Sequence, residues 1–152
     1  MDSGPPSFLH GNIEITRQFR FSKTQLEFML EAKKILAVLE DLFFTVKINE
    51  SAKRAGLGIT FVKSEHDVLE QAKHHPALII VDLNFHGVEP LKLIRKLKAD
   101  EHTKSINLVG YLSHIQGELK QQAQEAGCNM VLARSAFSQN LPQILKRHAA
   151  SL

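Results

Sequence analysis

The sequence is poor in the features of cross-linked, secreted or membrane-spanning proteins. Cys128 is the single cysteine, so no disulfide can form within the chain, which favours a reducing compartment. No stretch approaches the roughly 20 consecutive apolar residues of a membrane-spanning helix. No charged segment leads into an apolar run near the amino terminus, so a secretory signal is not expected. These absences predict a cytoplasmic protein that does not enter a membrane.

Basic residues are neither in large excess nor clustered. The 19 Lys and Arg residues outnumber the 16 Asp and Glu residues and give a net charge of +3. A nucleic-acid-binding face usually carries a basic cluster or stripe, so direct binding to nucleic acid is not expected. The chain is 43% hydrophobic and 23% charged, which is typical of a globular protein. Its 152 residues are enough for one core and too few for two ordinary domains.

The first 32 residues differ from the rest of the chain. A Gly-Pro-Pro sequence near the start indicates an irregular leader. Apolar residues on alternate positions then predict a short strand: Ile13, Ile15, Phe19 and Phe21. Residues 24–33 have the pattern of a helix, although Met29 could also be the natural start of the protein. We therefore expect an amino-terminal extension over residues 1–32 and a folded domain over residues 33–150.

From Lys34 onward, short apolar runs alternate with segments that have helical spacing. The expected strands cover residues 35–39, 59–62, 77–81, 106–112 and 130–133. The expected helices cover residues 42–55, 64–73, 90–99, 116–126 and 141–148. Five alternations with short connections predict an α/β fold, a doubly wound parallel sheet of five strands between two layers of helices.

Individual residues predict where several helices begin and end. Gly56 and Gly127 stand where helices would stop, because glycine readily adopts the left-handed conformation of a helix end. Ser64 and Asn140 are suitable amino-terminal caps, and Pro90 suits the first turn of a helix.

Polar residues directly follow four of the expected strands. Glu40 and Asp41 follow the first strand, Asp82 the third, Ser113 the fourth and Arg134 the fifth. In open parallel sheets, binding sites lie beyond the carboxyl ends of the strands. We therefore expect three carboxylates, a hydroxyl and a guanidinium to gather at one edge of the sheet.

These residues, in this order, resemble the receiver domain of two-component response regulators, the CheY-like family with a flavodoxin-like fold. The resemblance runs from Lys34 to about Lys146 and rests on two strands with acidic ends, Lys34-Ile-Leu-Ala-Val-Leu-Glu-Asp41 and Leu78-Ile-Ile-Val-Asp82. Ser113 stands where the family has a Thr or Ser, and Arg134 where it has a Lys. The resemblance implies the strand order 2-1-3-4-5 and a phosphorelay signalling domain rather than an enzyme.

The resemblance also implies a role for each residue. Asp82 would accept the phosphoryl group, Ser113 would be the switch hydroxyl, and Arg134 would be the cation that contacts the phosphate. Mg²⁺ prefers oxygen ligands, and the implied set is Glu40, Asp41, Asp82 and the main-chain carbonyl of Asn84. A histidine kinase or a phosphotransfer protein would be the donor, and an unidentified protein would be the downstream partner.

Several positions depart from the family pattern. Counting back from Gly56 places the acidic pair of the family at Leu39 and Glu40, whereas a shift of one residue places it at Glu40 and Asp41. Arg134 replaces a lysine, and its planar fork differs in reach and geometry from an ammonium group. The alternative is therefore a pseudo-receiver, which would act through protein contacts without phosphate.

Each site residue also has a purely structural interpretation. Asp82 could cap the turn that follows its strand, and the acids at 40 and 41 could begin a helix. Arg134 could form an ion pair across the strand ends. Cys128 is expected to be buried and inert.

Two other chemistries find less support in the sequence. His86 and His114 could form a zinc site with Asp82, but no close ligand spacing accompanies them. A haloacid-dehalogenase-type phosphatase would need a second aspartate two positions after Asp82, where the chain has Asn84.

Overall fold

The structure is a computed structural model that describes residues 22–24, 34–113 and 116–150. The strand expected within residues 13–21 and nearly all of the helix expected over residues 24–33 lie outside the described residues. All of the strands and helices named below belong to the unit Glu31–Leu152. The boundary between extension and domain at residue 32 stays a prediction.

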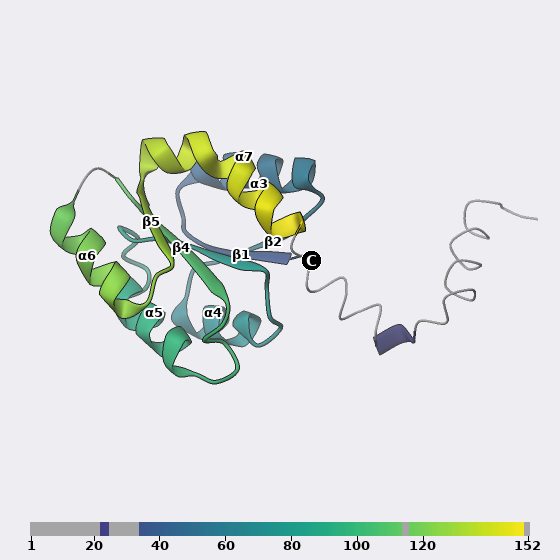
Figure 1. Cartoon of the computed structure of the whole chain (residues 1–152), viewed down its shortest axis with the longest axis horizontal. Helices are drawn as coiled ribbons and strands as arrows, with labels where there is room; N and C mark the ends of the chain where they lie inside the picture. The colour runs from purple at the N-terminus through teal and green to yellow at the C-terminus, as the bar shows by residue number, and fades with distance from the viewer. Residues whose placement is uncertain (1–21, 25–33, 114–115, 151–152) are drawn as a thin grey trace, which may run out of the picture. The chain divides into compact units, whose positions relative to one another are not determined.

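Five parallel strands form one sheet in the order β2-β1-β3-β4-β5, as expected (Figure 1). The strands are β1 (Lys34–Val38), β2 (Gly58–Val62), β3 (Leu78–Asp82), β4 (Asn107–Leu112) and β5 (Met130–Ala133). The doubly wound α/β fold is therefore confirmed. β3 lies in the middle, and all five of its residues are buried, because helices cover both faces of the sheet.

The five helices that follow the strands cover the two faces of the sheet. They are α3 (Leu42–Ala55), α4 (Glu65–Ala72), α5 (Pro90–Ala99), α6 (Gly117–Ala126) and α7 (Arg134–Ala150). α3 and α7 lie side by side on one face, and α4, α5 and α6 cover the other (Figure 1). Within the described part of the chain, no helix is long and apolar enough to cross a membrane.

Alternate residues of each central strand enter two separate hydrophobic cores. Leu36, Val38, Ile79 and Val81 pack in the core beneath α4, α5 and α6. The second core lies beneath α3 and α7 and contains the other side chains of these strands: Ile35, Ala37, Leu78 and Ile80. This alternation decides which face of the sheet each strand-end residue belongs to.

The predicted glycine and serine caps are confirmed. Gly56 and Gly127 end α3 and α6 with φ of 76° and 117°, conformations that glycine adopts without a steric penalty. Ser64 Oγ accepts a hydrogen bond from the Asp67 N–H at 3.1 Å and so caps α4.

The prediction for the last helix is wrong. α7 begins at Arg134, directly after β5, rather than at Leu141, and Pro142 lies inside it. Asn140 is therefore not a cap, and its Nδ2 donates to the Ala136 carbonyl at 2.8 Å. The first turns are held by tertiary packing, because the fully buried Phe137 ring stacks on Tyr111 with centroids 4.7 Å apart.

Candidate functional site

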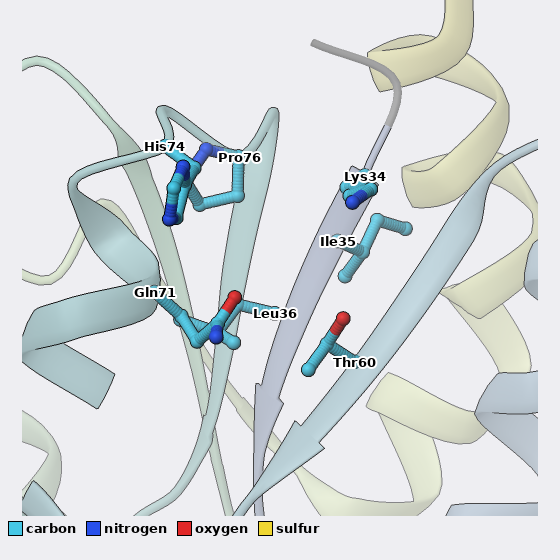
Figure 2. Close-up of a pocket in the computed structure, with 7 residues that line it drawn as sticks. All are labelled: Lys34, Ile35, Leu36, Thr60, Gln71, His74 and Pro76. Atoms are coloured by element: carbon cyan, nitrogen blue, oxygen red, sulfur yellow. The ribbon is translucent and has the colours of Figure 1, made fainter. Parts of the chain in front are cut away.

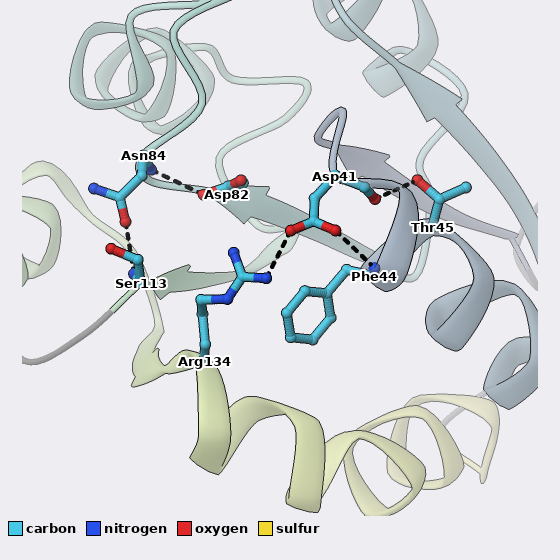
Figure 3. A network of polar contacts seen from close by, with 7 residues as sticks. All are labelled: Asp41, Phe44, Thr45, Asp82, Asn84, Ser113 and Arg134. Atoms are coloured by element: carbon cyan, nitrogen blue, oxygen red, sulfur yellow. Dashed lines mark hydrogen bonds and ion pairs between the residues drawn. The ribbon is translucent and has the colours of Figure 1, made fainter.

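The carboxyl ends of β1, β2 and β3 surround an open cavity of about 400 Å³. Its lining includes Glu40, Asp41, Lys63, Asp82 and Asn84. The three carboxylates predicted from the strand ends thus lie around one cavity. Ser113 and Arg134 are joined to this group by hydrogen bonds to Asn84 and Asp41 (Figure 3).

Asp82 is the last residue of β3, and only 8% of its surface is exposed. One carboxylate oxygen, Oδ1, accepts a hydrogen bond from the Asn84 N–H at 2.9 Å, so the expected turn cap is present. Burial raises the pKa of Asp82 above its ordinary value, against the opposing effects of that hydrogen bond and of the Arg134 charge. The same carboxylate lines the cavity, so the structural role and a chemical role are compatible.

Asp41 is held by contacts with two helices (Figure 3). Its Oδ1 accepts the Phe44 N–H at 3.2 Å and caps α3, while its Oδ2 lies 2.6 Å from Arg134 Nη2. Burial acts to raise the pKa of Asp41, but the hydrogen bonds from Arg134 and Phe44 outweigh it and leave the pKa below its ordinary value. The helix-start interpretation of Asp41 is therefore observed.

Arg134 is the first residue of α7, and its guanidinium pairs with Asp41. It also lies 4.7 Å from the centre of the Phe44 ring, a cation–π contact. The ion pair across the strand ends, one of the two interpretations of Arg134, is thus present. A direct pair between Arg134 and Asp82 is not among the ion pairs of the described residues.

The structure also distinguishes the two possible registers of the acidic pair. Leu39 is 1% exposed and packs in the core beneath α3 and α7. Glu40 is exposed and, with Asp41, lines the cavity. The pair that faces the cavity is therefore Glu40 and Asp41, and Leu39 contributes to packing.

Asn84 connects the loops that follow β3 and β4. Its Oδ1 accepts the Ser113 N–H at 2.6 Å, and its Nδ2 donates to Gln116 Oε1 at 3.0 Å. In this contact Ser113 is joined to the site through its main-chain N–H, and the residue is exposed. Gln116 was not predicted, because its partner lies 32 residues away in sequence.

Two further residues near the cavity were not predicted. Lys63 directly follows β2 and lines the cavity, so the rule that selected the other strand ends would have found it. Tyr111 pairs in register with Asp82 across β3 and β4. Its buried hydroxyl has no hydrogen-bond partner among the described residues, and no local pattern in the sequence indicates this placement.

The donor set determines which metals the site suits. No group of three or more His, Cys, Asp or Glu side chains in the described ranges could hold a metal ion. This finding gives no support to a zinc site, nor to a metal held by all three predicted carboxylates together. Of the two expected histidines, His86 lines the cavity and His114 is outside the described residues. Mg²⁺ needs only one or two carboxylates, with carbonyls and waters as further ligands. Glu40, Asp82 and the Asn84 carbonyl fit that requirement.

A second, smaller cavity lies away from this edge of the sheet (Figure 2). It measures about 100 Å³, and its lining includes Lys34, Thr60, Gln71 and His74. Lys34 is the first residue of β1, whereas Asp82 is the last residue of the parallel strand β3. The two cavities are therefore at opposite ends of the strands, and the smaller one is not part of the candidate site.

The strand order and the helical layers define a receiver fold. Three solved structures with this fold illustrate the likeness. The phosphorylated cyanobacterial phytochrome response regulator is 21% identical with a TM-score of 0.65, and the match covers 76% of this chain and 89% of that one. The receiver domain of a sensor histidine kinase from Pseudomonas aeruginosa, with a magnesium ion in its active-site cleft, is 20% identical with a TM-score of 0.66 over 78% and 98% of the two chains.

The third structure is the signal receiver domain of a histidine kinase from Syntrophus aciditrophicus. It is 17% identical with a TM-score of 0.68, and the match covers 80% of this chain and 92% of that one. No protein-family model matches the sequence, and no curated protein matches it. The likeness is thus one of fold.

Proposed function

We propose that the chain is a receiver of a cytoplasmic phosphorelay and that it accepts a phosphoryl group on Asp82. One observation carries this proposal. Asp82 ends the central strand, and its carboxylate lines an open cavity with a second acid, Glu40, and a cation, Lys63. This is the edge at which a parallel sheet presents its ligands.

The reaction requires a nucleophile and neutralisation of charge. An Asp82 carboxylate oxygen attacks the phosphorus of a phosphohistidine on a histidine kinase or phosphotransfer protein. The phosphorus–nitrogen bond breaks, the imidazole leaves and takes up a proton, and an acyl phosphate forms. Positive charge stabilises the oxygens of the transferring group, and we assign this role to Lys63 and Arg134. Ser113 is the proposed switch hydroxyl.

Mg²⁺ is the proposed cofactor, held by Glu40, Asp82 and the Asn84 carbonyl. When bound, it neutralises charge on the phosphoryl oxygens and on the carboxylates. Burial raises the pKa of Asp82 and so favours its neutral form, and a cation beside it would restore the ionised nucleophile. Asp41, the remaining member of the predicted ligand set, accepts hydrogen bonds at both carboxylate oxygens and must release Arg134 to take part.

The Asp41–Arg134 pair favours a second candidate function. In this pair Asp41 Oδ2 lies 2.6 Å from Arg134 Nη2. The carboxylate and the guanidinium therefore have each other as partners when neither phosphate nor metal is bound. A chain held in one state by this pair would bind its downstream partner constitutively, as a pseudo-receiver does.

The deciding experiment is incubation of the full chain with Mg²⁺ and a small acyl-phosphate donor, followed by intact-mass measurement. The wild type is expected to gain one phosphoryl group. Asp82→Asn is expected to gain none, because an amide does not form the acyl phosphate. Asp67→Asn is the matched control, since it changes an exposed acid in the first turn of α4, and it should gain the group as the wild type does.

The other outcomes are equally informative. A phosphoryl group retained by Asp82→Asn would show that another residue is the acceptor. No gain in the wild type, together with partner binding that Asp82→Asn leaves unchanged, would favour the pseudo-receiver. Continuous turnover of a small phosphate ester would instead indicate a phosphatase.

A further inference from the structure

The outer side of α3 begins with an apolar cluster. Leu42, Phe43 and Val46 are 76%, 62% and 53% exposed, and they are the large hydrophobic side chains that the described residues leave exposed. Single exposed hydrophobic residues are normal on a protein surface, whereas a contiguous group marks an interaction site. These three lie within five consecutive positions of one helix.

Charged residues continue this cluster along the helix. Lys47, Glu50 and Arg54 line the same surface groove as Phe43 and Val46. Phe43, Lys47, Glu50 and Arg54 are spaced by four, three and four residues. Alternating spacings of four and three residues are those of the seam between two packed helices. This row, in which Lys47 is partly exposed and the other three residues are exposed, therefore has the spacing of a helix that packs against another helix.

The order of side chains in the row is complementary to itself. In an antiparallel pair of identical helices related by a two-fold axis, each contact occurs twice with the partners exchanged. If Lys47 meets Glu50 of a second copy, the same register brings Phe43 against Arg54 of that copy. The first contact joins opposite charges, and the second places a guanidinium on an aromatic ring. No like charges meet in this register.

Within one chain these groups are only weakly engaged. Glu50 and Arg54 form an ion pair at 3.8 Å with side chains 61% and 80% exposed, a kind of pair that contributes little to stability. Lys47 forms no ion pair with another described residue. A second copy can therefore engage them at little cost.

We propose that two copies of this chain associate through α3 as an antiparallel helix pair, with Lys47 against Glu50 and Phe43 against Arg54 of the second copy. This inference goes beyond the proposed function and does not depend on phosphoryl transfer. One helix seam buries less than the roughly 800 Å² per partner of a stable complex. The expected dimer is therefore weak and concentration-dependent.

Sedimentation velocity of the full chain over a range of concentrations tests the proposal. The wild type is expected to shift from monomer to dimer as its concentration rises. Val46→Glu places an acid in the apolar cluster and should weaken dimerisation by about tenfold or more. Lys53→Glu is the matched control, because Lys53 is exposed on α3 but does not line the groove, and it should dimerise as the wild type does.

A charge exchange tests the register itself. Lys47→Glu alone and Glu50→Lys alone place like charges in contact and should each weaken dimerisation. The two substitutions in one chain restore opposite charges, as does an equimolar mixture of the two single variants, and both should recover the dimer. A wild type that stays monomeric, a dimer insensitive to Val46→Glu, or a failure of both rescues would overturn the proposal. These readouts are separate from phosphoryl gain, so failure of one proposal is distinguishable from failure of the other.

Discussion

At the scale of single residues, Tyr111 has a polar hydroxyl that is buried because its aromatic ring packs in the core. Its ring is fully buried, stacks on Phe137, and lies 4.9 Å from the Phe44 ring between centroids. Its hydroxyl has no partner among the described residues. Burial and the negative charges of Asp82 and Asp41 raise the pKa of Tyr111, so the phenol remains neutral beside the candidate site.

Tyr111→Phe is therefore expected to be tolerated. The substitution keeps the stacked ring and removes a hydroxyl that has lost its hydrogen bonds to water, so the free energy of unfolding should be unchanged or rise by about 1 kcal/mol. Tyr111→Leu removes the stacking and leaves a cavity, and it should lower the free energy of unfolding by roughly 2–4 kcal/mol. Urea unfolding measures both variants. A loss of more than about 1 kcal/mol in Tyr111→Phe would show that the hydroxyl does have a partner, such as an ordered water.

At the scale of elements, two helix ends that look alike in sequence differ in their surroundings. Gly56 and Gly127 both have positive φ, but a Cβ on Gly127 would lie 2.6 Å from Lys98 Cγ, whereas a Cβ on Gly56 would meet nothing within 4 Å. Lys98 cannot easily move, because its Nζ donates to the Ile106 carbonyl at 2.8 Å and to Asn129 Oδ1 at 3.0 Å. The end of α6 is therefore packed, and the end of α3 is open.

This difference predicts unequal costs for the same substitution. Gly56→Ala should lower the free energy of unfolding by about 1 kcal/mol, through backbone strain alone. Gly127→Ala should cost roughly 2 kcal/mol or more, because strain is joined by displacement of Lys98. Gly117→Ala is the control, since Gly117 begins α6 with open space around it, and it should be neutral or slightly stabilising. Equal losses at Gly56 and Gly127 in denaturant unfolding would contradict this account.

Most elements could be predicted from the sequence because their signals are local. Apolar runs located the five strands, and Gly56, Ser64 and Gly127 located helix ends, since each acts on its own backbone. The start of α7 could not be predicted in this way. Asn140 and Pro142 resemble a helix start, whereas the true first turns are held by contacts of Phe137 with residues of α3 and β4.

The candidate site was predictable to a similar extent. The rule that parallel strands present ligands at their carboxyl ends located Glu40, Asp41 and Asp82 around one cavity. It could not decide which acid pairs with Arg134, because that choice depends on side-chain directions of residues far apart in sequence.

At the scale of the whole molecule, the Asp41–Arg134 pair joins the starts of the two helices that cover one face of the sheet. The paired residues are 93 positions apart in sequence, and their side chains are 25% and 33% exposed. A partly buried pair of this kind, with a cation–π contact to Phe44, contributes more than a fully exposed pair. It therefore links the stability of the fold to the ionisation of Asp41.

Arg134→Gln is expected to lower the free energy of unfolding by about 1 kcal/mol near neutral pH, through loss of the ion pair and of the cation–π contact. The folded-state pKa of Asp41 lies below its ordinary value, so the stabilisation is complete above the unfolded pKa of about 4 and is lost as the pH falls through the lower folded value. The difference between wild type and variant should accordingly stay constant down to about pH 4 and shrink below it.

Urea unfolding at a series of pH values measures this difference. Lys73→Gln is the matched control, because the Lys73–Glu70 pair is 3.1 Å long with side chains 62% and 53% exposed, and its removal should change the free energy of unfolding by less than about 0.5 kcal/mol. A difference between wild type and Arg134→Gln that persists undiminished well below pH 4 would show that Arg134 stabilises the fold through its packing on Phe44 rather than through the charge of Asp41.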